Sequence, residues 1–100
     1  MDNEYSYKNV GDGSKNVTTA GTAVALAASS IPCRAVLVHA KPENTGVVVV
    51  GASTVVASAS TRRGIALLPG EKVLLRVTDV SSLYLDSAVS GEGVSFAYFW

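Results

Sequence analysis

The sequence predicts a small all-β domain, either an antiparallel β-sandwich or a jelly-roll-like barrel, with an extended N-terminal arm. Seven short apolar runs fill residues 17–100, and a turn signal closes each of them. The runs recur about every ten residues, which is typical of sandwiches and barrels. No window shows the 3.6-residue period of a helix. We therefore expect an arm over residues 1–16 and a sandwich domain over residues 17–100.

The strands are expected where apolar residues alternate or cluster between turn residues: 22–26, 34–40, 47–50, 65–68, 72–78, 83–85 and 94–100. In the second run Val36, Val38 and Ala40 share one face, because side chains alternate across a strand, and we expect this face in the core. Pro69-Gly70 predicts a tight turn in which the glycine takes a positive φ.

The intervening segments are expected to be turns and loops. Residues 41–46 contain Pro, Asn and Gly and predict a turn, and residues 79–82 predict a turn or a short helical turn. Residues 52–63 form the longest irregular stretch, in which 54–56 predicts a short strand at most. In the run 72–78, Leu74 is the one apolar residue on the otherwise polar face.

Two strands are apolar on both faces. In 47–50 all four residues are valine, so one pair faces the core and the other pair needs a different cover. At the C-terminus Phe96, Tyr98 and Trp100 lie on one face, and Phe99 lies on the opposite face. Because Phe99 and Trp100 cannot easily share one core, we expect a partner or sister subunit to cover at least one of them.

The polar segment 1–16 is read as an arm because Asn, Asp, Ser, Gly and Lys dominate it. Tyr5 and Tyr7 are its expected anchors on a neighbouring molecule. The alternative is that the segment forms an ordinary edge strand on its own domain.

Composition excludes several classes of function. The formal net charge is zero and only 16% of residues are charged, so no basic surface predicts binding to nucleic acid or to a membrane. No apolar run reaches the ~20 residues of a membrane span, and the polar first sixteen residues predict no signal peptide. The single cysteine, Cys33, is expected to be a buried apolar residue in a protein that folds in a reducing cytosol.

The pattern also predicts a protein that is not an enzyme and holds no metal or cofactor. The only histidine, His39, falls in a predicted strand and is expected to be exposed or hydrogen-bonded there, not part of a catalytic triad. Metal-ligand spacings are missing. Five acidic residues are expected at turns, where they cap and solvate the chain: Glu43, Glu71, Asp79, Asp86 and Glu92.

Residues 22–100 resemble a group of small structural proteins and domains of tailed-phage particles. The matching segments are Gly21-Thr22-Ala23-Val24, Ile31-Pro32-Cys33-Arg34, Lys41-Pro42-Glu43-Asn44-Thr45-Gly46, Gly64-Ile65-Ala66-Leu67, Leu68-Pro69-Gly70-Glu71, Leu83-Tyr84-Leu85-Asp86 and Gly91-Glu92-Gly93-Val94. The resemblance implies a β-sandwich in a virion that is assembled in the host cytoplasm. Such domains are capsid decoration proteins, head-fibre bases or other small structural subunits. The resemblance favours a capsid decoration protein that binds the major capsid protein or another virion protein, as a homo-oligomer with a trimer favoured.

Two other functions stay open: a subunit of the tail or head–tail connector, and a carbohydrate-binding sandwich for host adhesion. The sugar-binding hypothesis needs an aromatic platform, for which Trp100 and Tyr84 are the candidates. Arg62 and Arg63 form the only pair of like charges and are expected either to contact an acidic neighbour or to form a solvated loop tip. The predicted contact residues are Tyr5, Tyr7, Arg62, Arg63, Phe99 and Trp100.

Overall fold

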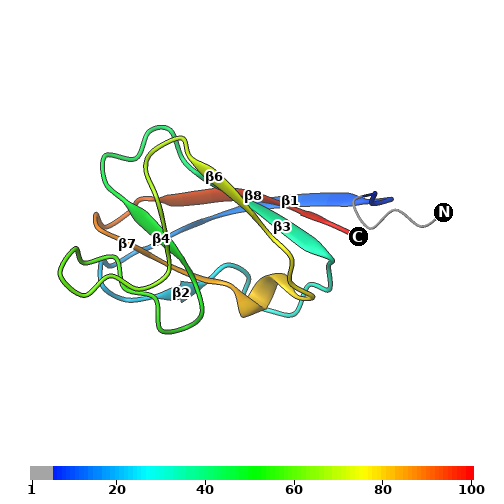
Figure 1. The fold of residues 1–100 in the computed structure, drawn as a ribbon, viewed down its shortest axis with the longest axis horizontal. Coiled ribbons are helices and arrows are strands. Elements are labelled where there is room, and N and C mark those ends of the chain that lie inside the picture. The colour runs from blue at the N-terminus through cyan, green and yellow to red at the C-terminus, as the bar shows by residue number, and fades with distance from the viewer. Residues whose placement is uncertain (1–5) are drawn as a thin grey trace.

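The structure, a computed structural model, describes residues 6–100. These residues form two four-stranded antiparallel sheets that pack face to face (Figure 1). The first sheet has the strand order β1 (Val10–Asn16), β8 (Gly93–Phe99), β3 (Ala35–Ala40) and β6 (Lys72–Leu75). The second has the order β2 (Val24–Ala25), β7 (Tyr84–Ser87), β4 (Val48–Gly51) and β5 (Ile65–Leu67). A single 3-10 turn, η1 (Val80–Ser82), precedes β7.

The strand order is that of a jelly roll. β1 pairs with β8 and β3 with β6 in one sheet, while β2 pairs with β7 and β4 with β5 in the other. The first strand thus pairs with the last and the second with the last but one, as in a long hairpin that has been rolled into two sheets. The predicted fold class is confirmed: the domain is a small antiparallel β-sandwich, and its strand order is that of a jelly roll.

The core lies between the two sheets. Val36 and Val38 of β3, Val48 and Val50 of β4, and Leu85 of β7 are all fully buried there. Each side chain of this size that leaves water contributes about 1.5–3 kcal/mol. The predicted core face of β3 is therefore confirmed, and in β4 it is the pair 48/50 that faces inward.

The expected N-terminal arm is wrong for residues 10–16, where the alternative of an edge strand is confirmed, and residues 1–5 of the segment lie outside the described residues. Residues 10–16 form β1, an edge strand of the first sheet, with Val10 opposite Phe99 and Asn16 opposite Gly93. Just before β1, the backbone N–H groups of Lys8 and Asn9 donate to the carbonyl of Trp100. The segment was read as an arm because its polar side chains and glycines are uncommon in strands, yet the backbone ladder with β8 holds it.

Two glycines let β1 lie against the aromatic side chains of β8. A Cβ on Gly11 would lie 2.3 Å from Cζ of Tyr98, and one on Gly13 would lie 2.6 Å from Cζ of Phe96. The two rings therefore extend across the neighbouring strand at positions that only glycine leaves open, and they cover the inner side of this sheet edge.

The second sheet is covered on its outer side by the protein itself. Val49 points away from the main core and is fully buried in a second cluster with Val55 and Ala57. These two residues belong to the irregular segment 52–64, which loops out beside β2 and β7 (Figure 1). The expectation that a partner covers the second valine face is wrong for Val49, because this segment supplies the cover.

Asp86 holds the covering segment 52–64 in place through a hydrogen bond from the Ala57 N–H. Its side chain is 1% exposed within β7. Oδ1 accepts hydrogen bonds from the backbone N–H groups of Gly21 and Ser87, both at 2.9 Å, and Oδ2 accepts one from Ala57 at 2.8 Å. The expected placement of Asp86 in a solvated turn is therefore wrong, because its carboxylate joins two loops to one strand.

Other acidic residues cap turns, as predicted. Asp79 caps η1 by accepting from the Ser81 N–H at 2.9 Å, and Glu71 accepts from the Leu68 N–H at 2.8 Å. Glu92 accepts from the N–H groups of residues 45 and 46 at 2.7 and 3.0 Å. These carboxylates satisfy backbone donors that the turns would otherwise leave without partners.

Two of these caps predict a loss of stability in acid. Hydrogen bonds from Ser30 and Ser81 hold the pKa of Asp79 well below its ordinary 3.8, and those from Thr45 lower the pKa of Glu92 below 4.5. The folded state therefore binds fewer protons than the unfolded state, so this stabilisation is complete above the unfolded pKa values and disappears as pH falls through the folded ones. We expect the melting temperature to fall between about pH 5 and pH 2. Asp79→Asn should flatten this dependence, and an equally steep profile for the variant would contradict the assignment.

Cys33 is buried, as expected, and its thiol donates to the Val77 carbonyl at 3.3 Å. Burial raises the pKa of the Cys33 thiol, and the charge of Asp79 raises it further. Because the thiolate is the reactive form, we expect alkylation by iodoacetamide at pH 7.5 to be at least about tenfold slower in the folded protein than in denaturant. Equal rates would show that the segment before β3 that contains Cys33 is open in the native state.

Candidate functional site

The outer face of the first sheet is partly open to solvent, with Leu74 48% exposed and Asp12 and Lys72 exposed at its two edges. Because the ladders fix which residues lie side by side, each strand contributes every second residue to this face. By strand, from β1 through β8 and β3 to β6, these residues are Val10, Asp12 and Ser14; Ser95, Ala97 and Phe99; Ala35, Leu37 and His39; and Lys72 and Leu74.

The middle of this outer face is apolar and its two edges are charged. Ala97 and Leu37 lie next to each other in the centre, and Leu74, 48% exposed, lies beside Leu37. Asp12 lies on the β1 edge and Lys72 on the opposite β6 edge. An acidic and a basic edge thus flank an apolar centre.

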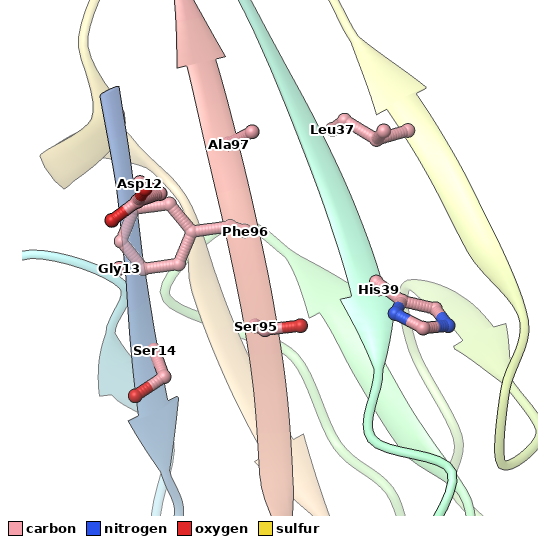
Figure 2. A pocket seen from close by; sticks show the side chains of 8 residues that line it. All are labelled: Asp12, Gly13, Ser14, Leu37, His39, Ser95, Phe96 and Ala97. Atoms are coloured by element: carbon pink, nitrogen blue, oxygen red, sulfur yellow. The ribbon is translucent and has the colours of Figure 1, made fainter. Parts of the chain in front are cut away.

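A hollow of about 570 Å³ runs along β8 on this face. Its floor is low because Ser95 and Ala97 are small, and Leu37 and His39 of β3 form one wall (Figure 2). The other wall is β1, which contributes Asp12 and Ser14 from its outer face (Figure 2). The relief of the face is therefore a groove over β8 and a ridge over β3.

An aromatic cluster closes one end of the face. Tyr7 stacks on Phe99 with ring centroids 5.6 Å apart, and the Arg34 guanidinium lies 5.3 Å from the centre of the Tyr7 ring. On the opposite face of β8, Trp100 stacks on Tyr98 at 5.5 Å and is 43% exposed. Tyr7 thus contacts its own domain and covers Phe99, while Trp100 stays partly open to solvent.

The remaining predicted contact residues lie elsewhere. Arg62 donates through Nε and Nη2 to the Ala57 carbonyl at 3.2 and 2.9 Å, so its side chain holds the segment that covers the second sheet. The backbone of Arg63 pairs with Val56 in the same segment. Tyr5 lies outside the described residues. The six predicted contact residues are therefore not gathered at one surface.

The polar side chains of the groove belong to strand residues, and that of His39 is hydrogen-bonded. His39 and Ser95 lie side by side on neighbouring strands, and His39 Nε2 lies 3.1 Å from the Gly70 carbonyl. Within residues 6–100, no three His, Cys, Asp or Glu side chains gather in an arrangement that could hold a metal ion. The sugar-binding platform expected from Trp100 and Tyr84 is divided, because Trp100 follows β8 of the first sheet while Tyr84 packs on the outer side of the second.

Sequence reasoning missed most of this face. Leu74 gave a signal, as the one apolar residue on a polar strand face, but Leu37 and Ala97 could be placed beside it only through the pairing of three distant strands.

Among the described residues, the structure has no helix of the length and apolar character that would cross a membrane. Comparisons of this chain with protein families, with curated proteins and with solved structures find no match.

Proposed function

We propose that this protein is a non-enzymatic structural subunit of a tailed-phage virion, which binds and stabilises the capsid through protein–protein contacts. The observation that carries the proposal is the difference between the two outer sheet faces. The chain covers the outer side of the second sheet with Val55 and Ala57, whereas Leu37, Ala97 and Leu74 leave an open apolar centre on the first.

An exposed apolar patch with a polar rim is typical of a surface that binds another protein. Each 100 Å² of apolar surface that leaves water contributes about 2.5 kcal/mol, although association entropy offsets much of it. A shell that carries many copies multiplies a weak contact. A modest patch is therefore sufficient for a decoration protein.

The virion setting rests on the resemblance of residues 22–100 to phage structural proteins, and the jelly roll is compatible with it because capsid subunits often have this fold. The major capsid protein is the proposed partner, and the resemblance favours a trimer. Fold alone does not establish function, so a position in the tail or head–tail connector is the alternative within the same class.

The test is cryo-electron microscopy of particles that lack this chain, to which the purified protein is added. Density spread over the capsid shell is the expected result, and density only at the neck or tail would replace decoration by the connector function. Leu74→Asp should weaken binding, whereas Leu68→Asp should not, because Leu68 is also exposed but lies in the loop after β5. Particles that bind neither the unsubstituted protein nor the Leu68→Asp variant would contradict the proposal.

A carbohydrate-binding function is the second candidate, because the groove over β8 combines Asp12, Ser14 and His39 with an apolar floor, and lectins also use jelly rolls. A glycan array separates the two functions: specific glycan binding that Ser14→Trp abolishes would favour adhesion, and an empty array would favour the structural role.

A further inference from the structure

We propose that the outer face of the first sheet binds the same face of a second copy of this chain, about a twofold axis parallel to the strands between β8 and β3. The inference rests on the proposed function, in which this face binds another protein, and it names a second copy, in place of the major capsid protein, as the partner of the face. The pairing is a dimer, so it differs from the trimer that the resemblance implies.

The relief of the face is self-complementary about this axis. A rotation about an axis between β8 and β3 places β3 of the second copy over β8 of the first, and the reverse. The ridge residue Leu37 then lies over the small Ala97 of the other copy, because these two residues occupy the same row of the sheet. The next row exchanges His39 with Ser95 in the same way. Both grooves are thus filled by both ridges.

The charges select the same axis. The rotation places the β6 edge of one copy over the β1 edge of the other, so Lys72 comes over Ser14, the outer-face neighbour of Asp12 along β1. The same rotation places Leu74 over Asp12, so the long Lys72 side chain must reach Asp12 from the neighbouring row to form an acid–base contact, once at each edge of the interface. A twofold axis perpendicular to the strands and through the row of Asp12, Ala97 and Leu37 would instead place Asp12 over Asp12, and like charges at close range are unfavourable. Packed sheets also prefer nearly aligned strands, about 30° apart, which agrees with the parallel axis.

The size of the face predicts a weak dimer. Four strands about 4.8 Å apart and about five residues of about 3.4 Å give a face of roughly 19 by 17 Å. Side-chain relief raises the buried area, but the total stays near or below the ~1,200 Å² that marks weak and transient interfaces. We therefore expect a dissociation constant on the order of 10–100 μM, within reach of copies concentrated on a particle.

The first experiment is sedimentation velocity of the full chain from about 5 to 500 μM, over which such a dimer should go from monomer to mostly dimer. Ala97→Trp should raise the dissociation constant at least about tenfold, because the indole fills the groove that receives Leu37. The far-ultraviolet circular dichroism spectrum checks that this variant is folded. A protein that stays monomeric at 500 μM overturns the inference.

Charge exchange tests the axis itself without disturbing the core. Lys72→Asp and Asp12→Lys should each weaken the dimer several-fold, and the double variant should recover most of the loss because both contacts re-form with reversed sign. The matched controls are Arg63→Asp and Glu43→Lys, which make the same charge changes at exposed positions away from this face. Equal effects of controls and test variants, or no recovery in the double variant, overturn the proposed pairing.

Particle binding separates this inference from the proposed function. A chain that is monomeric at every concentration but still binds particles through Leu74 would overturn the second-copy inference and leave the virion function standing. A chain that dimerises as described but binds no particle would overturn the virion function and leave the second-copy inference standing.

Discussion

Replacing Asp86 by alanine is expected to remove about 3–5 kcal/mol of folding free energy. The substitution leaves the N–H groups of Gly21, Ala57 and Ser87 buried without their acceptor, and each such donor costs about 1–3 kcal/mol. Since a domain of this size is stable by only about 5–15 kcal/mol, the variant should be close to unfolding at 37 °C. Urea denaturation followed by tryptophan fluorescence measures the loss.

Asp86→Asn gives a finer test of the same geometry. With its carbonyl oxygen in the Oδ1 position the amide keeps the bonds from Gly21 and Ser87, but its NH₂ group then opposes the Ala57 N–H. We expect a loss of about 1–3 kcal/mol and faster hydrogen exchange in segment 52–64. Glu43→Gln, which neutralises an exposed acid, is the control and should stay within about 0.5 kcal/mol. A tolerated Asp86→Ala would show that the carboxylate does not fasten the loops.

Phe96→Ala is expected to cost about 3–5 kcal/mol, because the ring fills the core and extends over β1. Gly13→Ala alone should cost about 1–3 kcal/mol, since its Cβ would lie 2.6 Å from the ring. In the Phe96→Ala background the clash is gone, and the same glycine substitution should become favourable by about 0.5–1 kcal/mol.

A double-mutant cycle measures this reversal as a coupling energy between the two positions. Gly46→Ala, which lies outside the sheets, should show no coupling to Phe96→Ala and is the control. Additive effects of Gly13→Ala and Phe96→Ala would mean that the ring moves aside freely and that the glycine is not required by it.

The parts of the fold that local patterns govern could be predicted from the sequence. Alternation in β3 placed Val36 and Val38 in the core, and Pro69-Gly70 gave a turn whose glycine has a φ of 85°. β1 was missed because its stability comes from a ladder with a strand about eighty residues away and not from its own residues. From the sequence alone, Gly11 and Gly13 predict a loop. Their place in a strand is explained only by the rings of Tyr98 and Phe96, which occupy the space where their side chains would lie.

The candidate site was harder to predict for the same physical reason. The aromatic residues Tyr7, Phe99 and Trp100 were singled out as contacts with a neighbour, but Tyr7 and Phe99 cover each other within one chain. Likewise the second face of β4 is closed by Val55, whose place over Val49 depends on Asp86 and the loops that it binds. Burial by distant segments of the same chain carries no local signature.

The pairing of the first strand with the last also sets the order in which this protein can form. β8 lies between β1 and β3 and joins them into one sheet, yet it is synthesised after the other seven strands of the two sheets. Until residues 93–99 have left the ribosomal exit tunnel, β1 has no strand to pair with, and β3 is unpaired on the side where β8 will bind. Sheets closed by contacts so distant in sequence fold slowly, in milliseconds to seconds. During that interval, nascent chains on neighbouring ribosomes expose the same unpaired strand edges to one another. We therefore expect aggregation to increase with the number of chains in which β8 has not yet formed.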